Sequence, residues 1–442
     1  MNVLFLVLAF INIIIWIYFG LLLFSNLKKK PIFHGTNCSD KGIIYPSLSV
    51  IIPACNEEES IEQAVTQLIN QDYPNFEVVV VNDRSTDRTG VILAELDIKY
   101  PQLQVITIND LPPKWLGKNH AIYQGVKHAT GEWLLFTDAD IMFSPDSLKE
   151  TMSYSLENKL DHLTISPEAI TKGFFYGGLM SFFFFVITFL FITSKSAGLG
   201  AFNLVKKSVY NEIGGYEAIA MQPVDDFSFG KLVVKKGYKQ CFGYSRGLIS
   251  VKMYDNIFAM IKGIEKNQFA GSNYSVLGTL SACWILLFVH VYPFVGLFFG
   301  PEWARVLCGF SIIILLAIYN YSKKYVNVLL RHFLIHPISA LLYIWAILNS
   351  MVKILSRGGI EWRGKVYSLE GLRKHTIQMS KDIMYASKSF LYQKYPLTSF
   401  AKDQFSVHSA IDANKGLSFR DVFWHHEKTT PSTTSVTVCL LD

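Results

Sequence analysis

The fold of the soluble part is decided by the stretch LSVIIPACNEEE, residues 48–59, in which a short apolar run stops at a polar cluster. Three further apolar runs follow at residues 78–81, 105–108 and 133–136, and the first and last of these also end in polar residues. Continuous runs of this length are typical of strands buried on both faces, and their alternation with helical segments predicts a parallel sheet. Doubly wound sheets bind ligands at the carboxyl ends of their strands. We therefore expect a site at this edge.

The segment after the first run predicts a helix. Asn56, followed by the acidic residues 57–59, is a favourable helix start, and apolar residues with helical spacing continue to Ile69. No G-x-G-x-x-G follows the first strand, and no G-x-x-x-x-G-K-[ST] occurs in the chain. These absences from the sequence disfavour a dinucleotide-dependent oxidoreductase and a P-loop NTPase.

The composition indicates a membrane protein with a soluble part. Of the 442 residues, 50% are hydrophobic and only 17% are charged, whereas soluble proteins carry roughly 25% charge. The net charge of +6 comes from basic residues beside apolar runs, which is the pattern of membrane flanks rather than of a nucleic-acid surface. The six cysteines include no C-x-x-C pair, so neither a zinc site nor a redox motif is indicated.

The first uncharged run, residues 3–24, is long enough to cross the ~30 Å hydrocarbon core. It lacks the basic start and cleavage site of a signal peptide, and Lys28, Lys29 and Lys30 after it predict that the following domain is cytoplasmic.

Three later uncharged runs cover residues 276–299, 306–322 and 333–352. If all crossed the membrane, the basic segment 357–374 would lie outside, against the positive-inside rule. Either the last run is re-entrant, with a break near Pro337, or another span is miscounted.

These observations predict a division of the chain into six parts. They are an N-terminal anchor (1–27), a cytosolic catalytic domain (46–255) with an apolar interfacial segment (174–194), an interfacial amphipathic helix (256–272), membrane helices (276–356), a basic juxtamembrane motif (357–374) and a partly flexible tail (375–442).

The acidic residues point to a metal and a base. Asp138 and Asp140 flank one alanine after the run 133–136, so strand geometry would place both carboxylates on one side. Two hard oxygen donors suit Mg²⁺ or Mn²⁺ bound jointly with a substrate diphosphate; an acidic turn is the alternative.

Asp225 and Asp226 repel each other, which can raise one pKa toward the range of a general base. An ordinary helix N-terminus is the alternative for this pair.

These motifs, in this order, resemble the family 2 glycosyltransferases, which are inverting enzymes of GT-A fold using nucleotide sugars. The likeness covers residues 46–272 and rests on segments 50–58, 81–87 and 138–140 and on the late acidic pair. Within the family, segments 114–121 and 359–367 are most similar to membrane enzymes that glycosylate lipids, of the 4,4'-diaponeurosporenoate glycosyltransferase type. Hopanoid-associated and ceramide glycosyltransferases are looser relatives.

The resemblance implies an α/β GT-A domain, with a mixed, mostly parallel sheet, helices on both faces and attached transmembrane helices. It also implies a role for each matching residue: Pro53, Asn56 and Glu57 line the nucleobase pocket, Asp83 binds the base or ribose, Lys118 approaches the ribose and diphosphate, Asp138 contacts the ribose, Asp140 binds the divalent ion, and Asp226 is the catalytic base with Asp225 as a possible substitute.

One departure from the family bears on the product. Polymerising members carry Q-x-x-R-W, whereas this chain has Lys266 and Asn267 in the arginine and tryptophan places. Loss of the tryptophan platform disfavours processive synthesis, and Lys266 either approaches the diphosphate or is a membrane-surface lysine.

The apolar run 174–194 cannot cross the bilayer if this reading is correct, because it would place Asp140 and Asp226 on opposite sides. We expect it to lie in the interface or to line an acceptor groove with residues 182–185. Gly198, Gly200 and Ala201 match a family segment near the donor sugar; tight packing or a bulge is the alternative.

The sequence therefore predicts an enzyme of the bacterial inner membrane whose catalytic domain is cytoplasmic. It would move one sugar from a nucleotide-sugar donor, UDP-linked by family habit, to a carotenoid, hopanoid or sphingoid lipid. No nucleic-acid partner is expected. The alternatives are a catalytically silent membrane scaffold that keeps the fold and a processive polysaccharide synthase.

Overall fold

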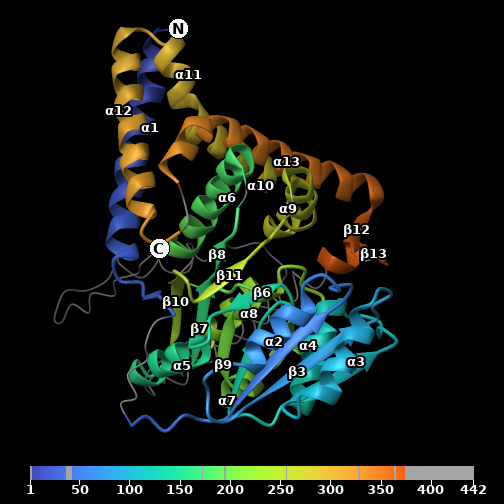
Figure 1. Ribbon diagram of the computed structural model, residues 1–442. Coiled ribbons are helices and arrows are strands. Elements are labelled where there is room, and N and C mark those ends of the chain that lie inside the picture. Colours follow the sequence, from blue (N-terminus) through green and yellow to red (C-terminus); the bar gives the residue numbers. More distant parts are fainter. Residues whose placement is uncertain are drawn as a thin grey trace, which may run out of the picture. The chain divides into compact units, whose positions relative to one another are not determined.

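The computed structural model describes residues 2–35, 42–171, 173–193, 196–254, 256–326, 329–362 and 365–373. The predicted tail, residues 375–442, lies outside the described residues. In Figure 1 the α/β domain is in the lower part of the view, and a group of long apolar helices is in the upper part.

The α/β domain is built on an eight-stranded sheet in the order β1-β10-β7-β9-β5-β2-β3-β4. The four predicted apolar runs form its parallel half: β2 (Leu48–Ala54), β3 (Phe76–Asp83), β4 (Leu103–Ile108) and β5 (Trp133–Phe136). The other half contains β1 (Ile32–Phe33), β10 (Gln240–Ser245), β7 (His162–Ser166) and β9 (Asn203–Lys206), of which β9 runs antiparallel to both neighbours. The predicted mixed, mostly parallel sheet is confirmed.

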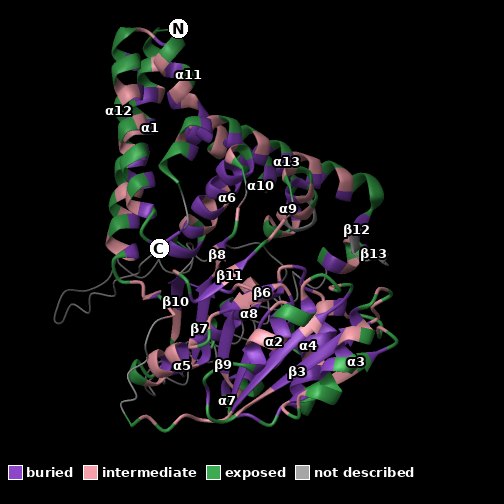
Figure 2. Ribbon diagram, viewed as in Figure 1, coloured by how far each residue is buried: buried purple, intermediate pink, exposed green. Residues whose placement is uncertain are grey.

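Helices cover both faces of this sheet, because alternate residues of each strand face opposite ways. Val50 and Ile52 pack with α2 (Ile61–Ile69), α3 (Thr89–Lys99) and α5 (Ser147–Glu157) on one face. Ile51 packs with α4 (Gly117–His128), α7 (Lys207–Glu212) and α8 (Asp225–Lys235) on the other. Strands β2, β3 and β5 are buried nearly throughout (Figure 2), which explains their apolar sequences, whereas β4 lies at the edge of the sheet and is only partly buried.

The predicted helix start at Asn56 is wrong. Asn56 has a left-handed backbone with φ of 57°, and α2 begins only at Ile61. The Asn56 side chain accepts a hydrogen bond of 2.8 Å from the Thr86 backbone N–H, so it joins two loops instead of capping a helix. Asparagine adopts the left-handed conformation more readily than most residues, and the turn uses that property.

A small second sheet is formed by three strands from separate parts of the chain. It has the order β6-β11-β8, formed by β6 (Ile141–Phe143), β11 (Ile249–Val251) and β8 (Glu168–Ala169). Strand β6 lies shortly after β5, and β8 leads into α6 (Phe174–Thr193).

Within the described residues, five helical segments are long and apolar enough to cross a membrane. They are α1 (Asn2–Leu27), α6, residues 276–299, α12 (Glu302–Ser322) and residues 330–357. The third joins α10 (Val276–Leu286) and α11 (Tyr292–Phe299) through a π-helical turn at Leu287–Val291. The last is a 3₁₀ turn (Leu330–Ile335) followed by α13 (His336–Arg357), so the helix type changes next to Pro337, where a break was predicted.

The amphipathic helix predicted at 256–272 is α9 (Ile257–Gly271), which packs along α13. After α13 the chain forms a hairpin of β12 (Gly359–Trp362) and β13 (Lys365–Ser368). Figure 1 shows α1 and α12 side by side, with α13 running across the top of α6, α9 and α10.

Candidate active site

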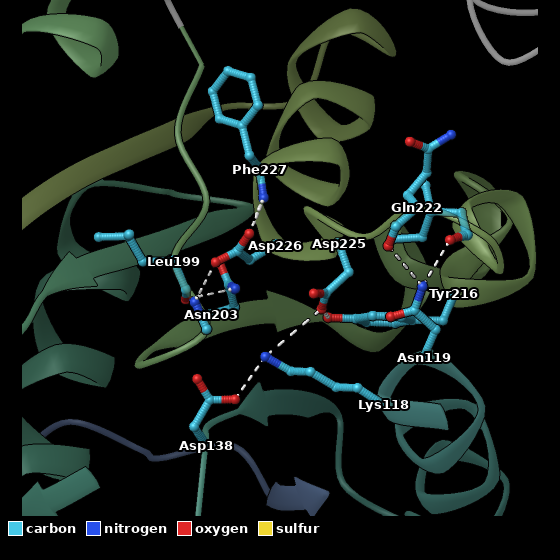
Figure 3. A network of polar contacts seen from close by, with 12 residues as sticks. Lys118, Asn119, Asp138, Leu199, Asn203, Tyr216, Gln222, Asp225, Asp226 and Phe227 are labelled. Atoms are coloured by element: carbon cyan, nitrogen blue, oxygen red, sulfur yellow. Dashed lines mark hydrogen bonds and ion pairs between the residues drawn. The ribbon is translucent and has the colours of Figure 1, made fainter. Parts of the chain in front are cut away.

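Lys118 lies at the centre of the candidate active site (Figure 3). It projects from the first turn of α4, and its Nζ lies 2.6 Å from Asp138 Oδ1 and 3.9 Å from Asp225 Oδ2. Asp138 follows β5, and Asp225 is the first residue of α8. Lys118 and Asp225, more than a hundred residues apart in the sequence, thus meet with Asp138 at the carboxyl edge of the parallel strands. The polar clusters at the strand ends predicted a site at this edge.

Asp226, the second residue of α8, is held by two backbone groups. Gly200 N–H donates to Asp226 Oδ2 at 2.8 Å, and Phe227 N–H donates to Asp226 Oδ1 at 2.7 Å. Asp226 is partly buried, whereas its neighbour Asp225 is 5% exposed and accepts a hydrogen bond of 3.4 Å from the Tyr216 hydroxyl. The pair does begin a helix, yet its two carboxylates have different environments.

Two glycines allow the loop before β9 to approach these carboxylates. A Cβ on Gly198 would lie 1.8 Å from the Asp226 carbonyl oxygen, which is an impossible contact. A Cβ on Gly200 would lie 2.5 Å from Asp138 Oδ2 and 2.9 Å from Lys118 Nζ. Gly198 therefore requires glycine, because its contact is with backbone, whereas at Gly200 a side chain would displace the ends of Asp138 and Lys118.

The site holds more negative than positive charge among these residues, and the pKa values reflect it. Burial, with the charges of Asp138 and Glu57, raises the pKa of Asp140 to about 7. Burial and the neighbouring Asp225 raise the pKa of Asp226 to about 7. Burial alone would lower the pKa of Lys118, but Asp138, Asp225 and Asp226 together raise it. A further cation would therefore be stabilised here.

Asp138 and Asp140 fit a divalent ion only in part. The strand argument for their orientation is wrong, since β5 ends at Phe136 and Asp140 lies in the following turn. The two carboxylates are nevertheless close enough for Asp138 to raise the pKa of Asp140. Among the described residues, no group of three or more His, Cys, Asp and Glu side chains is arranged to hold a metal. These two oxygen donors suit Mg²⁺ or Mn²⁺ if a substrate supplies the remaining ligands.

The residues predicted to bind the nucleobase lie at the ends of β2 and β3. Asp83 is buried, and Arg84 donates to both of its carboxylate oxygens, at 2.7 and 2.9 Å. Pro53 is partly buried next to Val81 in the sheet register. Asn56 is exposed, and the Glu57 N–H donates to the Thr89 hydroxyl at 2.8 Å. The structure gathers these residues at one edge, with Asp83 already paired to its neighbour.

Two other predicted features stand apart from this cluster. Lys266 lies on α9, but its side chain is outside the described residues. Phe182 and Phe185 are buried in the helical group, where Phe182 packs on His290, His336 and Tyr343, so they do not line an open acceptor groove.

Sequence reasoning missed Arg84 as the partner of Asp83, and Tyr216 as the hydroxyl donor to Asp225. Arg84 directly follows Asp83 and could have been suspected from its charge. Tyr216 gave no signal, because its contact with Asp225 depends on how the 3₁₀ helix Gly215–Ile219 packs on α8.

The mixed, mostly parallel sheet with helices on both faces defines a domain of GT-A fold. Residues 49–216 match Glycosyl transferase family 2, so this part of the chain is a family 2 glycosyltransferase domain. It is 26% identical over 342 residues to the 4,4'-diaponeurosporenoate glycosyltransferase of Staphylococcus aureus strain bovine RF122 / ET3-1, a match covering 74% of this chain and 89% of that one. The protein of the same name from strain MRSA252 is 25% identical with the same coverage.

Among solved structures, the fold is similar to that of a mannosyltransferase from Pyrobaculum calidifontis in complex with GDP-Man and Mn²⁺. The TM-score is 0.53 at 20% sequence identity, with 79% of this chain and 99% of the mannosyltransferase covered. At this identity the likeness is one of fold. It confirms the predicted GT-A architecture.

Proposed function

We propose that this enzyme transfers a single sugar from a UDP-sugar to a membrane lipid, with inversion at the anomeric carbon and with a divalent ion at the diphosphate. The observation that carries the proposal is the meeting of Lys118 with Asp138 and Asp225 at the ligand-binding edge of the sheet. The activity for which the S. aureus relatives are named supports a carotenoid acceptor, and the long apolar helices support a lipid acceptor.

Asp226 is the base in this proposal. Its two oxygens each accept one backbone N–H, which fixes the carboxylate while leaving lone pairs for the proton of an acceptor hydroxyl. A pKa of about 7 suits a base that works near neutral pH. Asp225 is more buried and already bound by Tyr216, so it acts mainly by raising the pKa of its neighbour.

Lys118 and the two motif aspartates handle the leaving group. The Lys118 ammonium lies where it can exchange its contact with Asp138 for a diphosphate oxygen, which stabilises negative charge as the sugar departs. Asp138 and Asp140 would hold Mg²⁺ or Mn²⁺, which supplies further positive charge for the same purpose. Attack from the face opposite the diphosphate then gives one displacement and an inverted product.

The placement of α6 supports a catalytic domain that stays on one side of the membrane. Before this helix, Ala169 pairs with Val251 in the small sheet. After it, the Ala197 N–H donates to Gln240 of β10 at 2.7 Å. Both flanks are therefore tied to the α/β domain, so the chain rejoins that domain after α6. With Lys28–Lys30 after α1, we assign this domain to the cytoplasmic face of a bacterial inner membrane.

The decisive experiment uses membranes supplied with labelled UDP-sugar and lipid extract. Asp226→Asn and Asp140→Asn should each abolish transfer to lipid, whereas Glu95→Gln, an exposed carboxylate on α3, should leave it unchanged. Normal turnover in both site variants would refute the proposal.

Two measurements separate the remaining alternatives. A silent scaffold should show no metal-dependent UDP binding by calorimetry, whereas the proposed enzyme should bind UDP with Mn²⁺ and lose that binding in chelator. Mass spectrometry of the lipid product should show the addition of one sugar. A ladder of added sugars would instead indicate a processive synthase.

A further inference from the structure

The C-terminal helix α13 presents two different faces. One face packs on α6 and α9 and contains polar side chains: the Tyr343 hydroxyl donates to Gln268 at 3.1 Å, and Ser350 Oγ accepts from the Phe269 N–H at 3.2 Å. The other face, together with the preceding turn, bears exposed large apolar residues that recur every three, four or seven positions. We call these residues the apolar stripe: Leu334, Ile338, Leu341, Trp345, Val352 and Leu355.

The start of α13 lies near the end of α12 that faces the catalytic domain. The His336 ring lies 5.8 Å from the ring of Tyr319, which is one turn from the end of α12 at Ser322. Just beyond, Tyr325 packs on Tyr244 of β10, with ring centroids 5.4 Å apart. The chain therefore passes the α/β sheet at Tyr325 shortly before it enters α13, whose first residue, His336, packs inside the helical group on Tyr319 and His290.

The end of α13 is also held by the catalytic domain. After Gly358, the hairpin β12–β13 places Ile360 and Tyr367 in one buried cluster with Leu116, two residues before Lys118. Further on, the Arg373 guanidinium donates to the Tyr274 carbonyl oxygen at 2.8 Å. The chain therefore leaves α13 at the edge of the candidate active site.

We propose that α13 does not cross the bilayer but lies along the leaflet next to the catalytic domain, with the apolar stripe inserted among the lipid tails. A crossing helix of 22 residues, about 33 Å long, would place its two ends on opposite sides of a ~30 Å core. The chain instead contacts the catalytic domain at Tyr325, shortly before α13, and again at Ile360, directly after it. The protein-bound face of α13 includes polar side chains, and its other face is apolar and bears Trp345, a residue suited to the membrane interface.

The lipid bilayer is the occupant that the structure favours for the apolar stripe. The stripe continues the exposed apolar surfaces of α1 and α12, which are themselves of membrane-spanning length. Lys353 and Arg357 lie at the end of α13, where lipid headgroups attract basic side chains. Three crossings then remain, by α1, residues 276–299 and α12, so that the basic segment 357–374 stays on the catalytic side.

The side of the membrane on which the hairpin after α13 lies can be measured by cysteine labelling. In a full-length background with its six cysteines replaced by serine, single cysteines are introduced as Ser368→Cys in the hairpin, Asn109→Cys in the catalytic domain and Val3→Cys at the start of α1, all exposed positions. A membrane-impermeant maleimide should label Ser368→Cys and Asn109→Cys in the same vesicle orientation and Val3→Cys in the opposite one. Labelling of Ser368→Cys together with Val3→Cys would overturn the proposal.

The depth of the apolar stripe in the bilayer can be measured with spin labels. Spin labels at Ile338→Cys, Trp345→Cys and Leu355→Cys should all be more accessible to oxygen than a label at Ala346→Cys on the buried face, and all should report depths within one leaflet, under about 15 Å. A depth maximum at Trp345→Cys with Leu355→Cys returning to the far surface would show a crossing helix. Strong spin–spin broadening with low oxygen accessibility would show a second copy of the chain on the stripe, and would also overturn the proposal. Variants are compared only if their thermal unfolding matches that of the background.

Discussion

The backbone N–H of Gly200 donates a hydrogen bond of 2.8 Å to the Asp226 carboxylate, which lies 26 residues further along the chain. This contact ties the loop before β9 to the first turn of α8. The loop contains Gly198 and Gly200, which have no Cβ. Its backbone can therefore approach the Asp226 backbone and carboxylate closely. The position of the proposed base therefore depends on glycines as well as on aspartates.

Gly198→Ala should displace Asp226 and strongly reduce transfer. The added Cβ would meet the Asp226 carbonyl oxygen at 1.8 Å, so the start of α8 must move. We expect a loss of stability of about 1–3 kcal/mol and a loss of kcat larger than that destabilisation explains. The control is Gly271→Ala, since a Cβ there meets nothing within 4 Å. Equal activity of the two variants, measured by lipid glycosylation and thermal unfolding, would contradict this reading.

Lys118→Met should reduce kcat by roughly 10²–10³-fold, the usual effect of removing one group that stabilises transition-state charge. The variant also leaves Asp138 and Asp225 without their nearby ammonium, so the pKa of Asp225 should rise further. Steady-state kinetics with varied donor are the measurement. Lys127→Met, an exposed lysine on the same helix, should have near wild-type kinetics. A comparable loss of kcat in both variants would show that the defect comes from disturbing α4 and not from removing the charge at position 118.

Transfer should depend on pH through Asp226. Burial and Asp225 raise its pKa to about 7, so below that pH the carboxyl is protonated and cannot accept a proton from the acceptor. We expect kcat/KM to fall roughly tenfold per pH unit on the acid side. Asp225→Asn removes the neighbouring charge and should move this acid limb to lower pH. An acid limb that stays in place in that variant would argue against Asp226 as the titrating base.

Arg84→Gln should weaken donor binding and destabilise the fold. It removes both hydrogen bonds to the buried Asp83 carboxylate, leaving that charge poorly compensated at a cost of about 1–3 kcal/mol. Thermal unfolding and UDP calorimetry measure the two effects. The double variant Asp83→Asn/Arg84→Gln should recover much of the stability but not the binding. Recovery of binding as well would remove Asp83 from the proposed donor site.

The sequence by itself determined the α/β architecture, because apolar runs such as residues 78–81 can be buried only inside a sheet covered on both faces. It also indicated where the polar edge lies and which segments are long and apolar enough to cross a membrane. It failed at Asn56, where cap chemistry favours a helix in isolation. There the contact with Thr86, thirty residues away, decides the conformation instead.

Tertiary structure alone decided how the two acids of the pair differ and where α13 ends. Asp225 and Asp226 are identical side chains, but Tyr216 and Lys118 contact Asp225, whereas the N–H groups of Gly200 and Phe227 contact Asp226. The direction of α13 is likewise fixed by contacts at its two ends, near Tyr319 and Leu116, and not by its hydropathy. Hydropathy depends on the residues of one segment, whereas these features depend on which distant segments that segment meets.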